Sequence, residues 1–335
     1  MRIAIVKISA LGDIIHAMVA LQFIKSFDKE VSVDWIVDEA YKELFDHCPD
    51  INQVHIIKLK ECKKKKSLAL LLNELKKVRK LGPYDIVIDM QGLIKSAIVS
   101  KLIPAHKTIG FDKESIRERL ASVFYSDKFN YEYSMNVIER NVALIEFALN
   151  MSISKLQIQQ KAPFLLPRSL KLVSNLSTFK KNIILIPGAS HISKCYPPSK
   201  FAELTALFDA NFLVIWGNKE EKIMANKIKE LSNKVNVCNQ LQLEDLMLLI
   251  SKVDLVIGSD TGPTHMAWAM NIPSITLFGP TPGYRNTFET TINRIIESDS
   301  KVDPCNIDKK DNSIKKIEVQ KILKMSKELL EINNN

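Results

Sequence analysis

The chain of 335 residues exceeds the usual size of one hydrophobic core, so we expect two compact lobes. Its composition of 46% apolar and 25% charged residues excludes a disordered or a fibrous protein. No apolar run reaches the ~18 residues of a membrane-spanning helix, and residues 1–6 indicate a strand rather than a signal peptide. We therefore expect a cytoplasmic protein.

The net charge of +9 indicates an anionic partner, which could be a nucleic acid, an acidic lipid or a phosphorylated substrate. The excess is spread over both halves of the chain, and its densest run is 58–66, where six lysines accompany one glutamate. Such a run could simply be a flexible, solvated loop. The five cysteines are scattered and lack a C-x-x-C spacing, which favours reduced thiols over disulfides or a zinc site.

In the first half, short β-rich runs alternate with helical patterns, which is typical of βαβ units around a parallel sheet. Helices are predicted at Asp13–Phe27, Leu68–Leu81 and near Ser134–Leu149, and Gly82-Pro83 ends the second of them. The predicted strands are Arg2–Ile8, Ser32–Val37, Val54–Ile57, Asp85–Asp89 and Lys107–Gly110.

The same pattern restarts after a proline-containing connector at 161–167, so we place the lobes at 1–165 and 166–313. A final segment, 314–335, is predicted as a helix over Ile314–Ile332 that could pack back toward the first lobe, with a frayed polar tail. Strands of the second half are predicted at Asn182–Ile186, Phe212–Trp216, Val235–Cys238, Leu255–Ile257 and Ser274–Phe278. The pattern therefore predicts an α/β protein of two Rossmann-like lobes.

Ligands of parallel α/β sheets bind outside the carboxyl ends of the strands, so the loops that follow strands are the candidate sites. The loop at 8–16 lacks a G-x-G-x-x-G sequence, which argues against a dinucleotide cofactor there. Asp13 in this loop could cap the next helix or act as a general base.

The loop at 256–267 follows an apolar strand and enters a helix near Pro263, a favoured first residue of a helix. Free backbone N–H groups and the helix dipole make this place suitable for a pyrophosphate, although a capped helix without a ligand is the alternative. The loop at 187–197 offers Lys194, which could hold a diphosphate or be a solvated lysine. The loop at 216–221 offers Glu220 or Glu221 to a ribose diol; position favours Glu220, but the pattern does not separate the two.

Three segments together resemble the heptosyltransferase family: Arg2-Ile3-Ala4-Ile5-Val6-Lys7 with Leu11-Gly12-Asp13, Ser259-Asp260-Thr261-Gly262-Pro263-Thr264-His265, and Phe278-Gly279-Pro280-Thr281. The resemblance extends through nearly the whole chain. It implies the GT-B fold, in which two Rossmann-like lobes face a central cleft, with the acceptor in the first lobe and the nucleotide sugar in the second. Residues 88–96 and 117–125 are similar to the type I branch of the family.

The resemblance implies an inverting transfer of L-glycero-D-manno-heptose from ADP-heptose to Kdo of Kdo2-lipid A, in inner-core lipopolysaccharide synthesis. Asp13 would be the base, and Lys194 would stabilise the departing ADP. The implied donor contacts are Ser190, Glu220, Leu241, Asp260, Thr261, Gly262 and His265. The acceptor contacts that we expect are Lys63, Lys64, Lys65, Lys66, Gln91, Lys95 and Arg117.

No D-x-D sequence accompanies these residues, so we expect neither a metal nor another cofactor. The acceptor implies a peripheral protein at the inner face of the cytoplasmic membrane. We expect no nucleic acid, because no RNA-binding aromatic motif accompanies the lysines. The alternatives are a heptosyltransferase of another core position, a GT-B-like sugar-nucleotide epimerase, and a non-enzymatic binder of nucleic acid or membrane surfaces.

Overall fold

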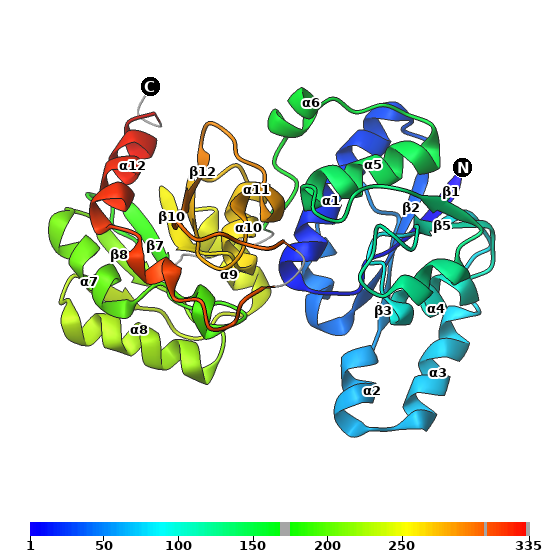
Figure 1. Ribbon diagram of the computed structural model, residues 1–335, viewed down its shortest axis with the longest axis horizontal. Coiled ribbons are helices and arrows are strands. Elements are labelled where there is room, and N and C mark those ends of the chain that lie inside the picture. Colours follow the sequence, from blue (N-terminus) through cyan, green and yellow to red (C-terminus); the bar gives the residue numbers. More distant parts are fainter. Residues whose placement is uncertain (168–174, 305–306, 333–335) are drawn as a thin grey trace. The chain divides into compact units, whose positions relative to one another are not determined.

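The computed structural model describes residues 1–167, 175–304 and 307–332. They form two compact units, Met1–Phe164 and Leu165–Asn335 (Figure 1). The predicted tail at 333–335 and Cys305 lie outside the described residues. The four cysteines that are described, Cys48, Cys62, Cys195 and Cys238, are free thiols. Within the described residues, no helix combines the length and the apolarity needed to cross a bilayer.

The first unit contains a parallel sheet in the order β3-β2-β1-β4-β5-β6. Its described strands are β1 (Arg2–Val6), β2 (Ser32–Asp38), β3 (Gln53–Ile57), β4 (Tyr84–Asp89), β5 (Ala105–Phe111) and β6 (Asp127–Phe129). Five of them lie where the alternating pattern predicts strands. Strand β6 escaped the prediction because its three residues are too few to show a period.

Helices surround this sheet, and one of them corrects the interpretation of the lysine run. The helices are α1 (Leu11–Phe27), α2 (Leu59–Lys65), α3 (Leu68–Val78), α4 (Ile94–Leu102), α5 (Val137–Leu149) and α6 (Lys155–Gln159), with 3-10 turns at Glu39–Phe45 and Arg119–Phe124. The run expected as a flexible loop is α2, because lysine is a good helix former and Cys62 is buried. Lys66 ends the helix in the left-handed conformation, at φ 48°.

The second unit contains a parallel sheet in the order β12-β11-β10-β7-β8-β9. Its described strands are β7 (Asn182–Ile186), β8 (Asn211–Val214), β9 (Val235–Val237), β10 (Leu255–Ser259), β11 (Ser274–Phe278) and β12 (Asn293–Glu297). Its helices are α7 (Pro198–Leu207), α8 (Lys219–Leu231), α9 (Leu243–Ile250), α10 (Gly262–Ala269), α11 (Gly283–Asn286) and α12 (Val319–Ile332), with 3-10 turns at Ile192–Lys194 and Ser313–Lys316.

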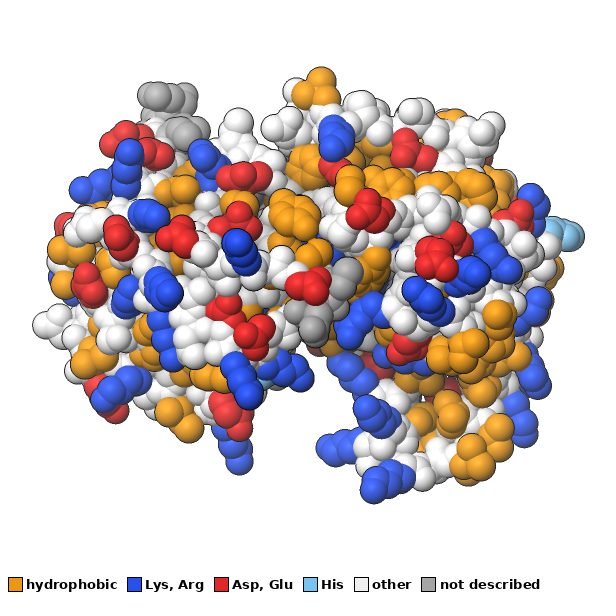
Figure 2. Space-filling model, in the orientation of Figure 1, with side chains coloured by type: hydrophobic (Ala, Val, Ile, Leu, Met, Phe, Trp, Pro, Cys, Tyr) orange, Lys and Arg blue, Asp and Glu red, His pale blue; other side chains and the backbone are white. Residues whose placement is uncertain are grey.

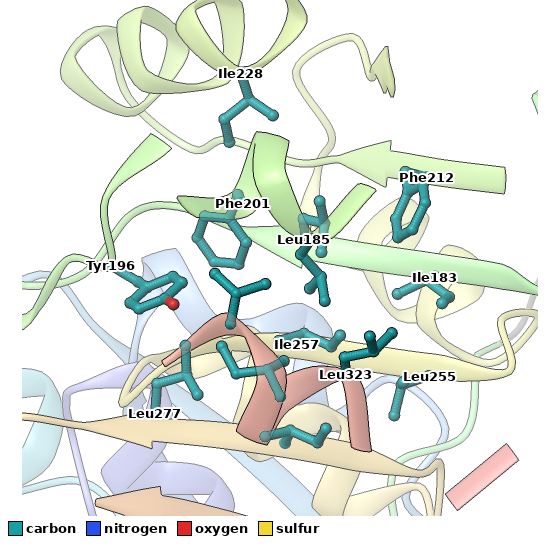
Figure 3. Packing of buried hydrophobic residues seen from close by; sticks show 14 of the residues in the cluster. Ile183, Leu185, Tyr196, Phe201, Phe212, Ile228, Leu255, Ile257, Leu277 and Leu323 are labelled. Carbon is teal, nitrogen blue, oxygen red and sulfur yellow. The ribbon is translucent and has the colours of Figure 1, made fainter. Parts of the chain in front are cut away.

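Apolar strands and the helices above them make the core of each unit. In the second unit, Leu185 and Ile257 of the sheet pack with Phe201 of α7 and Leu323 of α12 (Figure 3). Helix α12 therefore belongs to the core of the second unit. The Tyr196 hydroxyl donates to the Ile317 carbonyl at 3.0 Å and so holds the segment that leads into α12.

The two sheets share one topology. In each unit the first strand lies beside the second on one side and beside the fourth on the other. The order in which the chain adds strands across the sheet therefore reverses between β1 and β4 and between β7 and β10, although all strands are parallel. Doubly wound sheets bind ligands at this switch point, outside the carboxyl ends of the strands. The loops after β1, β4, β7 and β10 are therefore the places where the fold positions a site.

Candidate functional site

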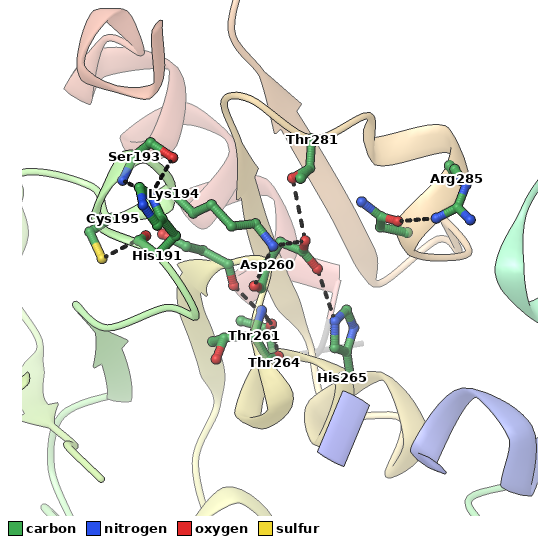
Figure 4. A network of polar contacts seen from close by, with 12 residues as sticks. His191, Ser193, Lys194, Cys195, Asp260, Thr261, Thr264, His265, Thr281 and Arg285 are labelled. Carbon is green, nitrogen blue, oxygen red and sulfur yellow. Dashed lines mark hydrogen bonds and ion pairs between the residues drawn. The ribbon is translucent and has the colours of Figure 1, made fainter. Parts of the chain in front are cut away.

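A buried carboxylate organises the switch point of the second unit (Figure 4). Asp260 follows β10, and its Oδ2 lies 2.5 Å from Nζ of Lys194, which comes from the loop after β7. Its Oδ1 lies 3.1 Å from Nε2 of His265 in α10. The Thr281 hydroxyl, in the loop after β11, donates to Oδ2 at 3.3 Å. The three loops therefore converge on one side chain.

This network keeps Asp260 ionised. The side chains of Asp260 and Lys194 are only 11% and 12% exposed. Burial alone would raise the pKa of Asp260, but the Lys194 charge and the His265 hydrogen bond outweigh it and hold that pKa well below its usual range. Because the folded pKa is depressed, the pair contributes stability above the unfolded carboxyl pKa of about 4 and loses it only as the pH falls further.

The N-terminus of α10 lies beside this network, as the sequence predicts. The helix begins at Gly262, and Pro263 lies in its first turn. The hydroxyl of Thr264 lies 2.7 Å from the Thr261 carbonyl and accepts from the Thr261 N–H at 3.3 Å, which fixes the turn. Lys194 and the positive end of the helix dipole therefore occupy one place, where an anion is stabilised twice.

In the loop after β8, the structure distinguishes the two glutamates, Glu220 and Glu221, between which the sequence does not decide. Glu221 accepts from the Gly217 N–H at 2.6 Å and from the Asn218 side-chain amide at 2.8 Å, at the start of α8. Its side chain also packs against Gly188 in the loop after β7. Glu220 is exposed to solvent. The structure thus directs Glu221, and not Glu220, toward the loop that carries Lys194.

The remaining predicted donor residues lie around these loops. Ser190 is exposed in the loop after β7, and Leu241 is partly buried in the segment after β9. Gln240 ties that segment to the loop after β8 by donating to the Gly217 carbonyl at 3.0 Å. Lys194, Asp260, Thr261, Gly262 and His265 are therefore brought together, while Ser190 and Leu241 lie on neighbouring loops.

The switch point of the first unit gathers another set of polar residues. Asp13 is exposed in the first turn of α1, where its Oδ2 accepts from the Ala10 N–H at 3.2 Å. The preceding Ser9 hydroxyl lies 3.2 Å from Nε2 of Gln91 and 3.3 Å from Nζ of Lys95. The loop that carries Asp13 is thus attached to Gln91 and Lys95, two of the residues predicted for the acceptor.

Arg117 belongs to a segment that packs against the loop after β4, the loop that carries Gln91. Ile116 lies against Gly92, which has a positive φ of 67° and has no room for a side chain. The Glu118 carboxylate accepts from the Ile94 N–H at 2.7 Å. Arg117 itself is exposed. The lysines at 63–66 lie apart from this group, on α2 and its C-terminal cap.

The sequence pattern does not predict two buried charged groups near the loops after β1 and β4, namely Lys7 and Asp89. Lys7 is 8% exposed, and its Nζ donates to the Met90 carbonyl at 2.7 Å. Burial lowers the pKa of Lys7, and the negative charge of Asp13 opposes that shift. Asp89 is fully buried and accepts from the Gln91 N–H at 2.8 Å and from the Tyr125 hydroxyl at 2.8 Å. Their only signal in the sequence is a charged residue at the end of an apolar strand.

The fold and these loops define a two-unit α/β protein of the nucleotide-binding type. The family model described as glycosyltransferase family 9 (heptosyltransferase) matches residues 73–314. The chain belongs to this family, and it is therefore a glycosyltransferase of the heptosyltransferase kind.

Individual relatives agree with the family. The chain is 39% identical to lipopolysaccharide heptosyltransferase 1 of Campylobacter coli, over 98% of this chain and 99% of the relative. It is 30% identical to lipopolysaccharide heptosyltransferase 1 of Escherichia coli (strain K12), over 84% of this chain and 89% of the relative.

A solved structure with a nucleotide sugar analogue is similar as well. It is E. coli heptosyltransferase WaaC with ADP-2-deoxy-2-fluoro heptose, at 25% identity and a TM-score of 0.76, covering 98% of this chain and 99% of that one. The predicted α/β, GT-B class of fold is thereby confirmed.

The contact between Gly188 and Glu221 yields a stability prediction. A Cβ at Gly188 would lie 2.3 Å from the Glu221 Cδ, so Gly188→Ala should displace that side chain from the start of α8. We expect a loss of about 1 kcal/mol, the usual net contribution of a hydrogen bond, because Glu221 would no longer accept from the Gly217 N–H. Urea unfolding followed by tryptophan fluorescence measures it.

Gly217→Ala is the matched control, because the nearest atom to its Cβ would be at 3.4 Å. Equal losses in the two variants would contradict the contact between Gly188 and Glu221.

Proposed function

We propose that the protein transfers L-glycero-D-manno-heptose from ADP-heptose to Kdo of Kdo2-lipid A, with inversion at the anomeric carbon. Two relatives named lipopolysaccharide heptosyltransferase 1 and a similar structure titled with an ADP-heptose analogue support this proposal. The observation that carries it is the pairing of Lys194 with Asp260 at the N-terminus of α10, which makes an anion site at the switch point of the second unit.

The donor diphosphate binds at that site. Nζ of Lys194 has three donors; it contacts the Asp260 carboxylate at 2.5 Å and the Asp260 carbonyl at 3.5 Å, so one donor remains for a phosphate oxygen. The backbone at Thr261 and Gly262 contributes the helix dipole. As the bond between the anomeric carbon and the phosphate oxygen breaks, these groups stabilise the negative charge that ADP carries away.

The adenosine extends across the neighbouring loops. Ser190 contacts the phosphates from the loop after β7, and Leu241 approaches the adenine. Sequence position favours Glu220 for the ribose, but we propose Glu221, because its carboxylate faces Gly188 in the phosphate-binding loop. Ribose hydroxyls would then replace or join the Gly217 and Asn218 donors on that carboxylate.

Asp13 is the base. The Kdo hydroxyl oxygen attacks the anomeric carbon from the side opposite to ADP, and Asp13 accepts its proton, because a free alkoxide is far too basic to form at neutral pH. Asp13 suits this role since its carboxylate is exposed and uses only Oδ2, at 3.2 Å, on the backbone. Asp260 does not suit it, because its oxygens are engaged by Lys194, His265 and Thr281.

The acceptor side is basic. Gln91 and Lys95 lie beside the loop of the base, and Arg117 presents a guanidinium that suits the Kdo carboxylate. The lysines at 63–66 extend this charge toward lipid A phosphates at the inner face of the cytoplasmic membrane. The mechanism uses no metal and no other cofactor.

A transfer assay with ADP-heptose and Kdo2-lipid A tests the proposal. We expect one heptose to be added to Kdo, with or without EDTA. Transfer only to a longer core oligosaccharide would favour a heptosyltransferase of another position. Conversion of the donor sugar in the absence of any acceptor would favour an epimerase, and full loss with EDTA restored by Mg²⁺ would contradict the metal-free mechanism.

Asp13 should be essential for turnover but not for donor binding. Asp13→Ala and Asp13→Asn should both abolish transfer while changing the ADP-heptose dissociation constant by no more than a few-fold, because the donor residues lie in the other unit. Asparagine can still accept from the Ala10 N–H but cannot take a proton at neutral pH. Near-normal kcat in Asp13→Asn would show that the residue only stabilises the helix.

Lys194 should act on the leaving group. Lys194→Ala should lower kcat by about 30- to 1,000-fold, equivalent to about 2–4 kcal/mol of transition-state stabilisation. Lys252→Ala, which changes an exposed lysine before β10 in the same unit, is the control and should leave kcat unchanged. A Lys194 variant that loses only thermal stability, with an unchanged kcat, would assign the residue to structure alone.

A further inference from the structure

One helical hairpin of the first unit is strongly basic. Residues 58–80, which include α2 and α3, contain ten basic and two acidic residues, so their local net charge is +8. Both glutamates are paired within the hairpin: Glu61 with Lys65 at 2.6 Å and Glu74 with Lys77 at 2.5 Å. The basic residues are Lys58, Lys60, Lys63, Lys64, Lys65, Lys66, Lys76, Lys77, Arg79 and Lys80.

The same hairpin exposes large apolar side chains. Leu68 is 68% exposed and Leu72 is 50% exposed, and their spacing of four residues places them on one face of α3. The C-terminal half of α3 is anchored, because Val78 is buried in the first core and Leu75 packs against it. The N-terminal half therefore presents two leucines to solvent. Figure 2 shows hydrophobic side chains over α3 beside the blue side chains of α2.

We propose that the α2–α3 hairpin docks on the surface of an anionic lipid bilayer. Leu68 and Leu72 enter the boundary between headgroups and acyl chains, while the lysines around them bind lipid phosphates. This arrangement uses both features of the hairpin at once, since it removes the leucines from water and places the cations at the depth of the headgroups.

Two other occupants fit the surface less well. A nucleic acid would neutralise the lysines but leave Leu68 and Leu72 in water, because its phosphate backbone offers no apolar surface. A second copy of the chain would cover the leucines but, in a two-fold dimer, would bring one hairpin of +8 against another. Charge and apolarity together select an anionic bilayer.

The inference deepens the proposed function, since it rests on an acceptor that lies in a membrane. Vesicle binding is nevertheless measured without donor or acceptor, so the two can fail separately. Wild-type protein that binds vesicles but transfers no heptose would overturn the proposed function and support the docking surface. Transfer to a water-soluble acceptor without any vesicle binding would overturn the docking surface and support the proposed function.

Co-sedimentation of the full chain with vesicles is the first test. We expect binding to phosphatidylcholine vesicles that contain phosphatidylglycerol, weakened by salt, and no binding to phosphatidylcholine alone. Leu68→Ser with Leu72→Ser should weaken binding roughly tenfold, because two side chains no longer gain from leaving water. The matched control is Leu207→Ser with Leu231→Ser, whose leucines are 44% and 51% exposed in the second unit. Equal binding by both double variants would overturn the proposal.

Insertion is tested separately by fluorescence. Leu72→Trp should shift its emission to the blue with anionic vesicles and be quenched by brominated lipids, whereas Leu207→Trp should show neither effect relative to the wild type. An unchanged Leu72→Trp spectrum in bound protein would overturn insertion. A dimer that forms without lipid and disappears in the leucine double variant would identify a second copy as the occupant instead.

Transfer assays connect docking with catalysis. The leucine double variant should keep wild-type kcat and KM on an acceptor whose acyl chains have been removed. It should lose transfer to the same acceptor embedded in anionic vesicles. Equal losses on both acceptors would show that the substitutions damage the first unit rather than its docking surface.

Discussion

The site of the second unit depends on the compensation of one buried charge. An ionised carboxylate at this depth is unstable unless cations and hydrogen-bond donors surround it. Asp260 meets this condition through Lys194 from the loop after β7, His265 from α10 and Thr281 from the loop after β11. The contacts that neutralise Asp260 therefore also fix the positions of these loops relative to one another. They direct the Lys194 ammonium toward the N-terminus of α10.

The shared strand order explains why the chain carries two polar sites of opposite character. Each switch point opens at the carboxyl ends of two neighbouring strands, so Asp13 follows β1 as Asp260 follows β10. Their surroundings then differ. Asp13 is exposed and has one backbone contact through Oδ2, whereas Asp260 is enclosed by cationic and hydroxyl groups. The environment, and not the residue type, therefore separates the proposed base from a carboxylate that is held by its neighbours.

The sequence predicts what depends on local pattern and misses what depends on distant packing. Apolar strands such as β7 and β11 and the start of α10 at Gly262 follow from periodicity and helix signals, whereas the mixed sequence of β12 shows no clear pattern. The choice between Glu220 and Glu221 depends on Gly188, which lies 33 positions away from Glu221 in the chain. The buried position of Asp89 depends on the hydrogen bond that the Tyr125 hydroxyl donates to it. A contact between residues so far apart in the chain leaves no pattern in a single sequence.

The structure also divides the basic residues predicted for the acceptor into two groups. Lys95 contacts the Ser9 hydroxyl in the loop that carries Asp13, so its position is coupled to that of the proposed base. The lysines of α2 belong to a hairpin whose anchoring residues, such as Val78, lie in the core below and not in that loop. The residues proposed to contact the acceptor sugar and those proposed to dock on the membrane therefore lie on separate elements. Under these proposals, substitutions in the hairpin change membrane docking without altering the geometry around Asp13.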